Sequence, residues 1–312
     1  MTRPTILSMD NGHPGQMETL EEHFRVVKLR KPDPDRIIRE HSDEIKGIAS
    51  FLTPVGKNLI EALPNLEIIA VGAAGLDHID LETAWSRGIA VTNTPDILTD
   101  DTADVAMLLM LNVARRAVEG DAFVRAGLWR NGNLPLGATL SEKTAGIVGL
   151  GRIGGAIAQR AAAFNMDVAY YGPSEKPDEP YRYYNSLEVM AEECDFLILT
   201  CAGGEKTRHL VDSRILKALG PKGFVINVSR GSVIRERDLL VALRNKNIAG
   251  AGLDVYDNEP DVPEELITMD NVVLTPHIGS ATMETRVKMG RIVVENLLAQ
   301  FEARPLLTSI GA

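Results

Sequence analysis

The sequence predicts an α/β protein built from two doubly wound parallel sheets. Short apolar runs alternate with polar segments of helical spacing along nearly the whole chain, which is the pattern of parallel strands joined by helices. The chain has 312 residues, enough for two domains that each have a core of their own. A glycine-rich turn near the middle lies between an apolar run and an Ala-rich segment, and it predicts a strand, a turn and a helix in that order.

The first domain is expected to begin with five strands. The segments between them, such as residues 17–23 and 34–41, have the spacing of helices. The expected strands are residues 5–9, 25–29, 45–50, 66–71 and 89–92.

A long apolar helix is predicted over residues 102–118, with Thr99 or Asp100 as its N-cap. Because it is so apolar, we expect it to be buried between the domains or at a subunit contact. Residues 126–138 contain turn-forming residues and predict a projecting arm. Trp129 in this arm fits either a dimer anchor or ordinary packing under a loop.

The second domain is expected to contain six strands in alternation with helices, which matches a Rossmann domain. A final helix over residues 283–301 is expected to return to the first domain. The predicted domains are therefore residues 1–98 with 283–312, and residues 99–282. The six expected strands are residues 145–149, 168–171, 196–200, 225–228, 250–254 and 272–274.

The glycine-rich turn has the spacing Gly-x-Gly-x-x-Gly and predicts a dinucleotide site. Gly149 would make the tight turn, Gly151 would let the backbone approach a pyrophosphate, and Gly154 would let the helix pack on its strand. The N-terminus of the following helix would offer N–H groups to the phosphates. A glycine-rich turn without a ligand is the alternative, but the strand and helix on either side favour a nucleotide cofactor.

The type of coenzyme is indicated by the end of the second Rossmann strand. An enzyme selective for NAD places an acidic residue there for the ribose 2′-hydroxyl, and Gly172 and Pro173 stand there instead. Ser174 and Lys176 follow and could hold a 2′-phosphate, although Glu175 lies between them. NADP(H) is therefore favoured, and NAD(H) is possible.

Composition excludes several classes of partner. The formal net charge is −10, so a nucleic acid or an anionic membrane is not expected as a partner. No run of 18 apolar residues and no signal peptide is recognised. Cys194 and Cys201 lack the spacing of metal ligands and are expected to be free thiols in the cytoplasm; no metal is expected.

Three chemically useful side chains follow predicted strands of the second domain. Arg230, Glu259 and His277 should reach one edge of the sheet, where folds of this class bind ligands. Together they suit reduction of a 2-keto acid: His277 would donate the proton, Glu259 would orient the ring and favour its protonated form, and Arg230 would hold the substrate carboxylate. Singly, each also fits an ordinary surface or loop residue.

The order and spacing of four motifs resemble the D-isomer-specific 2-hydroxyacid dehydrogenases. The motifs are 149–154, 228–231, 252–255 with Glu259-Pro260, and 276–279. The resemblance implies a Rossmann cofactor domain inserted into a flavodoxin-like substrate domain, and a homodimer joined through the Rossmann domain. It also implies that Arg230, Glu259 and His277 are catalytic.

The resemblance further implies two sets of binding residues. The backbone of Ala73, Ala74 and Gly75 would take the substrate carboxylate, with Arg230 and His277. Asp254 would lie by the nicotinamide. The cofactor contacts would be Gly149, Gly151, Arg152, Ile153, Gly154, Ser174, Lys176, Cys201, Val228, Ser229, Arg230, Asp254, His277 and Gly279.

Within the family, residues 93–101 and 174–177 look most like glyoxylate/hydroxypyruvate and hydroxyphenylpyruvate reductases. Glyoxylate and hydroxypyruvate are the favoured substrates, with the D-2-hydroxy acid as product; a bulkier 2-keto acid such as hydroxyphenylpyruvate is the alternative. A sensor that binds a dinucleotide without catalysis is a second alternative, which the complete set of Arg230, Glu259 and His277 disfavours. A formate or phosphite dehydrogenase is a third.

Overall fold

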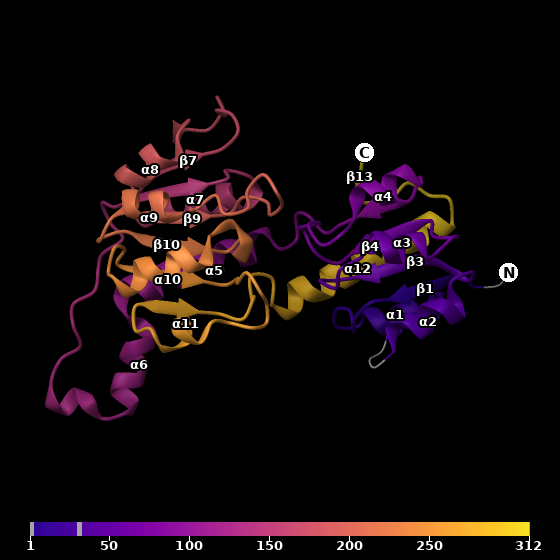
Figure 1. The fold of residues 1–312 in the computed structure, drawn as a ribbon, viewed down its shortest axis with the longest axis horizontal. Helices are drawn as coiled ribbons and strands as arrows, with labels where there is room; N and C mark the ends of the chain where they lie inside the picture. Colours follow the sequence, from indigo (N-terminus) through magenta and orange to yellow (C-terminus); the bar gives the residue numbers. More distant parts are fainter. Residues whose placement is uncertain (1–2, 30–32, 312) are drawn as a thin grey trace. The chain divides into compact units, whose positions relative to one another are not determined.

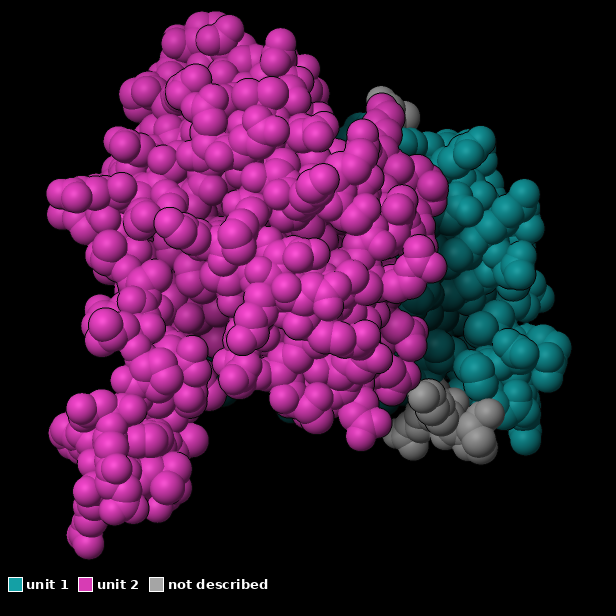
Figure 2. Space-filling model, turned by 60° about the vertical axis from the view of Figure 1, so that its left-hand side comes forward, with its two compact units in different colours: residues 1–98, 281–312 teal, residues 99–280 magenta. Residues whose placement is uncertain are grey.

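The computed structural model describes residues 3–29 and 33–311 and divides into two compact units. Unit 1 comprises residues 1–98 and 281–312, and unit 2 comprises residues 99–280 (Figure 2). Both are α/β units with a sheet of mainly parallel strands, which confirms the predicted fold class. None of the helices in the described ranges has the length and apolarity needed to cross a membrane.

Unit 1 contains a six-stranded sheet of order β13-β5-β4-β3-β1-β2 (Figure 1). Its five parallel strands follow the flavodoxin order, and β13 pairs with β5 in the antiparallel direction. The strands are β1 (Thr5–Ser8), β2 (Arg25–Lys28), β3 (Ile45–Ser50), β4 (Ile68–Val71), β5 (Ala90–Thr92) and β13 (Ser309–Ile310). The helices are α1 (Gln16–His23), α2 (Pro34–His41), α3 (Lys57–Glu61), α4 (Leu81–Ser86) and α12 (Met283–Phe301).

Strands β1 and β4 are buried along their whole length because both faces of the sheet are covered. In β1, Leu7 packs into the cluster that includes Ile60 of α3, whereas Ile6 packs into the cluster that includes Leu297 of α12. Successive side chains of a strand point to opposite faces, so each face needs its own apolar residues. Helix α12 packs against α1 and β4, so the last part of the chain completes this unit.

Unit 2 contains a seven-stranded parallel sheet of order β12-β11-β10-β9-β6-β7-β8 (Figure 1). This is the Rossmann order with one further strand. The strands are β6 (Thr144–Val148), β7 (Asp167–Tyr171), β8 (Arg182–Tyr184), β9 (Phe196–Leu199), β10 (Phe224–Asn227), β11 (Gly250–Leu253) and β12 (Val272–Leu274). The helices are α5 (Thr99–Arg115), α6 (Ala117–Arg125), α7 (Arg152–Ala163), α8 (Leu187–Glu193), α9 (Ser213–Leu219), α10 (Glu236–Arg244) and α11 (Glu264–Thr268), with 3₁₀ turns η1 (Leu128–Asn131) and η2 (Gly231–Val233).

Two short strands, β8 and β13, were not predicted. Each has only two or three residues, at the edge of its sheet. A run this short carries no periodicity that distinguishes a strand from a loop.

The prediction of one helix over residues 102–118 was wrong at both ends. Helix α5 already begins at Thr99, and it ends at Arg115. The backbone N–H of Ala138 donates to the carbonyl oxygen of Ala114 at 2.7 Å, and an uninterrupted helix would need that carbonyl for its own next turn. Arg116 then adopts a left-handed conformation with φ 53°, and α6 starts afresh. Helix α6, η1 and the chain up to residue 138 form the arm, and α6 projects from the rest of unit 2 (Figure 1).

Candidate active site

The predicted cofactor and catalytic residues of unit 2 all follow strands at the carboxyl edge of its sheet. Because the strands are parallel, these loops lie along one edge, where doubly wound folds bind ligands. Residues 149–154 follow β6, Ser174 and Lys176 follow β7, Cys201 follows β9, Val228, Ser229 and Arg230 follow β10, Asp254 and Glu259 follow β11, and His277 and Gly279 follow β12.

The three glycines of the turn after β6 have three different environments. Gly149 has φ +98°, a conformation that strongly favours glycine, and a Cβ there would lie 2.8 Å from the Cα of Cys201. A Cβ on Gly154 would lie 2.3 Å from the carbonyl oxygen of Gly149, so a side chain cannot fit where α7 packs on the turn. A Cβ on Gly151 would meet nothing within 4 Å. Open space at Gly151, at the start of α7, fits the close approach of a pyrophosphate.

Lys176 lies beside the glycine turn. Its Nζ atom donates to the carbonyl oxygen of Leu150 at 2.5 Å, and its backbone N–H donates to the Tyr170 hydroxyl at 2.7 Å. The ammonium is therefore near the predicted dinucleotide turn, and it is not a remote surface charge. Ser174 is exposed on the same segment.

Arg230 extends from a turn that Asn227 stabilises. The side-chain amide of the buried Asn227 donates to the Arg230 carbonyl oxygen at 3.0 Å, and its Oδ1 accepts from the backbone N–H and the hydroxyl of Ser229, each at 3.0 Å. A Cβ on Gly231 would lie 1.8 Å from the carbonyl carbon of Tyr256, so this turn packs directly on the loop after β11.

Glu259 and His277 form a hydrogen-bonded pair, although they are 18 positions apart in sequence. His277 Nδ1 lies 2.7 Å from Glu259 Oε2, and Glu259 Oε1 accepts from the Tyr256 N–H at 3.0 Å. Burial by itself would raise the pKa of Glu259, but the hydrogen bond and charge of His277, together with the charge of Arg230, lower it. Glu259 is therefore a carboxylate near neutral pH. Since Nδ1 is used by Glu259, Nε2 is the ring atom that can exchange a proton with a ligand.

The backbone around His277 is held in an uncommon conformation by Asp254. His277 has φ +52°, which is costly for a residue with a side chain. The Asp254 carboxylate accepts from the N–H groups of Ile278 and Gly279, both at 2.8 Å, and from the Thr275 hydroxyl at 2.6 Å. Burial raises the pKa of Asp254, and these hydrogen bonds oppose the rise.

Two supporting residues were not identified from the sequence. The Tyr256 hydroxyl donates to the carbonyl oxygens of Leu253, at 3.2 Å, and Thr275, at 3.0 Å, so it ties the loop that carries Glu259 to the strand before His277. The Thr102 hydroxyl of α5 donates to the Gly279 carbonyl at 2.9 Å. Neither residue lies in a pattern that marks a function, because a buried Tyr or Thr is ordinary in a core.

In unit 1, the predicted substrate loop presents a row of unused amides. Residues Ala73, Ala74 and Gly75 follow β4 at the carboxyl edge of that sheet. Within the described part of the chain, the N–H groups of these three residues donate no hydrogen bond, although Ala73 is buried. Successive free backbone N–H groups form the kind of concave site that binds anions.

Comparison with known proteins identifies the class. Residues 107–279 match the model of the D-isomer specific 2-hydroxyacid dehydrogenase NAD binding domain. The chain is 44% identical to glyoxylate/hydroxypyruvate reductase A of Arabidopsis thaliana over 293 residues, which are 93% of this chain and 94% of the relative. It is 47% identical to hydroxyphenylpyruvate reductase of Plectranthus scutellarioides over 252 residues, which are 81% of this chain and 80% of the relative.

A solved structure supports the same assignment. The NADPH-dependent glyoxylate/hydroxypyruvate reductase of Sinorhizobium meliloti, in complex with NADP and malonate, superposes with a TM-score of 0.95 at 41% identity, covering 99% of this chain and 97% of that chain. The chain belongs to the D-isomer-specific 2-hydroxyacid dehydrogenase family, as the motifs predicted. It is an oxidoreductase that acts with a nicotinamide dinucleotide on 2-keto or 2-hydroxy acids.

Proposed function

We propose that this enzyme uses NADPH to reduce a small 2-keto acid, glyoxylate or hydroxypyruvate, and that the product is the D-2-hydroxy acid where it is chiral. The observation that carries the proposal is the pair of His277 and Glu259, with 2.7 Å between Nδ1 and Oε2, at the edge where a nicotinamide cofactor belongs. A protein that only senses a dinucleotide has no need of such a proton donor.

Each of the three side chains has a role in this reaction. The bound nicotinamide supplies a hydride to the carbonyl carbon, and negative charge then develops on the carbonyl oxygen. His277 gives a proton from Nε2 to that oxygen, and Glu259 stabilises the imidazolium and fixes the ring. Arg230 holds the substrate carboxylate with its planar set of donors and polarises the carbonyl. The amides of residues 73–75 also bind the carboxylate.

The coenzyme part of the proposal rests on Lys176. A 2′-phosphate carries negative charge, and Lys176 places an ammonium beside the glycine turn through its contact with Leu150. Ser174 offers a hydroxyl on the same segment. The S. meliloti relative, which is NADPH-dependent and was solved with NADP, supports the preference.

The experiment that tests the function follows the absorbance of NADPH and of NADH with glyoxylate, hydroxypyruvate, pyruvate and hydroxyphenylpyruvate. We expect the highest kcat/KM with NADPH and the two small polar acids. If hydroxyphenylpyruvate is the best substrate, the alternative suggested by the Plectranthus relative replaces the proposal. Tight coenzyme binding with no turnover of any acid would favour a sensor.

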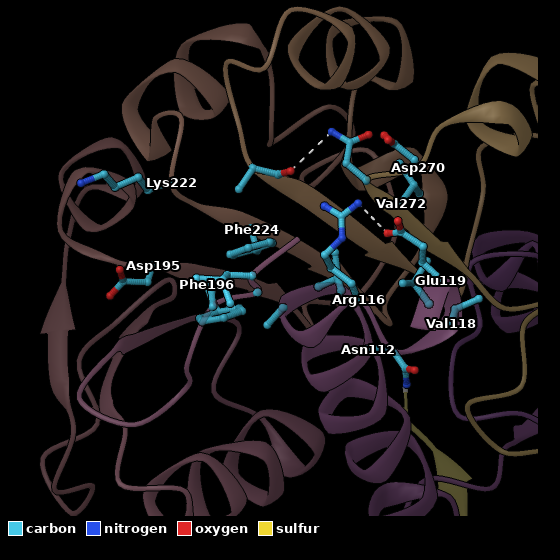
Figure 3. Close-up of a pocket in the computed structure, with 18 of the residues that line it drawn as sticks. Asn112, Arg116, Val118, Glu119, Asp195, Phe196, Lys222, Phe224, Asp270 and Val272 are labelled. Carbon is cyan, nitrogen blue, oxygen red and sulfur yellow. Dashed lines mark hydrogen bonds and ion pairs between the residues drawn. The ribbon is translucent and has the colours of Figure 1, made fainter. Parts of the chain in front are cut away.

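We also propose that two copies of the chain associate through unit 2. The arm exposes large apolar side chains, with Leu136 97% and Trp129 67% accessible. A hollow of about 590 Å³ lies beside it, and Figure 3 shows Phe196, Phe224 and Arg116 on its wall. Phe196 and Phe224 begin β9 and β10, so this hollow is at the amino edge of the sheet, away from the catalytic loops.

A second copy would cover apolar surface that a monomer leaves in water. Sedimentation equilibrium at micromolar concentration should give twice the chain mass of 33.9 kDa, and a single-chain mass would refute the dimer. The cytoplasm is the proposed compartment, because Cys194 and Cys201 are both free thiols.

A further inference from the structure

Three successive carbonyl groups of the loop after β4 each accept a hydrogen bond from another segment of unit 1. The carbonyl oxygen of Gly72 is 2.9 Å from His13 Nε2, that of Ala73 accepts from the backbone N–H of Thr94 at 3.0 Å, and that of Ala74 accepts from the Asn93 side-chain amide at 2.8 Å. A trans peptide unit is planar, so its N–H points away from its C=O. Fixing these carbonyls therefore fixes the directions of the N–H groups of Ala73, Ala74 and Gly75.

His13 is built tightly into this position. It is 4% exposed, and its ring meets the ring of Phe51 edge to face, with 4.7 Å between the centroids. A Cβ on Gly72 would lie 2.5 Å from His13 Nε2, and a Cβ on Gly290 would lie 3.1 Å from His13 Cβ. The two glycines leave room for a side chain that reaches the loop carbonyl. Since a carbonyl only accepts, Nε2 must carry the proton.

Asn93 is held in turn by the segment after α12. The Thr308 hydroxyl donates to the Asn93 carbonyl oxygen at 2.6 Å, and the Asn93 N–H donates to the Thr308 carbonyl at 3.4 Å. Asn296 of α12 is fully buried; its amide donates to the Thr308 hydroxyl at 3.0 Å, and its Oδ1 accepts from the N–H of Leu307 at 2.9 Å. Thr308, which Asn296 holds, thus fixes the position of Asn93, and Asn93 in turn holds the loop of residues 73–75 through its bond to Ala74.

The Asn93 side chain uses its donor but not its acceptor. It is 6% exposed, and its Oδ1 atom is buried with no hydrogen-bond partner among the described residues. An unpaired buried acceptor costs about 1–3 kcal/mol. An apolar side chain would avoid that cost but would leave the Ala74 carbonyl without its donor, so the role of Asn93 is the hydrogen bond that it donates to Ala74.

We propose that His13 and Asn93 are positioning residues, which orient the amides of residues 73–75 for the carboxylate of the 2-keto acid. The inference rests on the proposed function, and it adds two side chains that act through the loop backbone. They increase the affinity for the substrate, because donors that are already oriented lose less conformational entropy when the anion binds. They leave the chemistry of Arg230, Glu259 and His277 in unit 2 unchanged.

A matched pair of substitutions at His13 separates positioning from packing. In His13→Gln the side-chain amide can still donate to the Gly72 carbonyl, whereas His13→Phe keeps an aromatic ring against Phe51 and loses the donor. We expect His13→Phe to raise the KM for glyoxylate about tenfold, the loss of about 1.4 kcal/mol of binding. His13→Gln should stay within about twofold of wild type. A packing role predicts the reverse order, and that result would overturn the proposal.

The substitution Asn93→Leu provides a second, independent test of the proposal. It should also raise the KM for glyoxylate about tenfold, with a smaller change in kcat and none in the KM for NADPH. Asn65→Leu is the control, because Asn65 likewise donates from its side chain to a backbone carbonyl of unit 1, that of Asp43 at 2.9 Å. An equal effect of Asn65→Leu, or wild-type KM values for both Asn93→Leu and His13→Phe, would refute the inference.

A binding measurement keeps this test separate from the test of the function. Oxalate, a small dicarboxylate, is titrated calorimetrically into the enzyme saturated with NADP⁺. Weaker binding of oxalate by His13→Phe and Asn93→Leu than by wild type supports the positioning role, even if the wild type reduces none of the keto acids. Equal oxalate affinity in wild type, His13→Phe and Asn93→Leu, or no binding to wild type, overturns it.

Discussion

The carboxyl edges of the two sheets use different chemistry. In unit 2 the loops after β10, β11 and β12 present charged or titratable side chains, namely Arg230, Glu259 and His277. In unit 1 the loop after β4 presents backbone amides from Ala73, Ala74 and Gly75, and side chains such as those of His13 and Asn93 are turned inward to hold it. Both edges are placed where doubly wound folds bind ligands.

The difference teaches that binding and proton transfer need different groups. A proton donor has to be titratable near neutral pH, which only a side chain such as imidazole supplies. A carboxylate can be bound by backbone N–H groups, which every residue except proline has, provided that the loop is rigid. Substitutions of His277 and Glu259 at the unit 2 edge should therefore change kcat, whereas substitutions that disturb the loop of residues 73–75 at the unit 1 edge should change KM.

The largest effect is expected for His277→Ala. Because His277 is the proposed proton donor, kcat for glyoxylate reduction should fall about a thousandfold in this variant. The KM for NADPH should change little. Stopped-flow or long steady-state assays measure the rate, and circular dichroism checks the fold. Activity within tenfold of wild type would refute the contrast between the two edges, because proton transfer would then not depend on the His277 side chain.

Glu259→Gln should have a smaller effect, and one that depends on pH. The pKa of Glu259 lies below its ordinary value of 4.5, so the wild-type carboxylate stays ionised at neutral pH and stabilises a protonated His277. The amide cannot do this, so kcat should fall about tenfold at neutral pH, and the difference from wild type should shrink in acid, where Glu259 itself becomes protonated. Rate profiles extended into acid measure it, and a difference that is the same at every pH would contradict the role of the Glu259 charge.

The lowered pKa of Glu259 also predicts the sign of a stability effect. A carboxylate whose pKa is lower in the folded than in the unfolded protein stabilises the fold above its unfolded value. This contribution is lost as the pH falls through the folded value. Thermal melts should therefore show wild type and Glu259→Gln differing more at pH 7 than in acid.

An effect on KM that is confined to one coenzyme is expected for Lys176→Ala. Loss of the ammonium beside Leu150 should raise the KM for NADPH about tenfold, which corresponds to one charge-assisted hydrogen bond, and leave the KM for NADH unchanged. Parallel assays with both coenzymes measure the ratio. Lys217→Ala, at an exposed lysine of α9, is the control. An equal change in the KM for NADH would show that Lys176 does not bind the 2′-phosphate.

The sequence by itself determined the class of fold and the family, and it indicated which residues of unit 2 are proposed for the chemistry. Strands buried on both faces must be apolar throughout, and the three glycines of residues 149–154 mark the turn whatever surrounds it. Arg230, Glu259 and His277 each follow such a strand, and parallel strands bring their ends to one edge. The helix of residues 283–301 was predicted with the bounds of α12, because its apolar positions have helical period.

Only the tertiary structure decided what depends on contacts distant in sequence. Helix α5 ends at Arg115 because the N–H of Ala138 donates to the carbonyl oxygen of Ala114. No sequence pattern near Arg115 predicts that hydrogen bond. The strained backbone of His277 depends on Asp254, and the loop of residues 73–75 depends on His13 and on Asn93, which the end of the chain holds. Backbone donors have no sequence signature, because their direction is set by whichever groups hold their carbonyls.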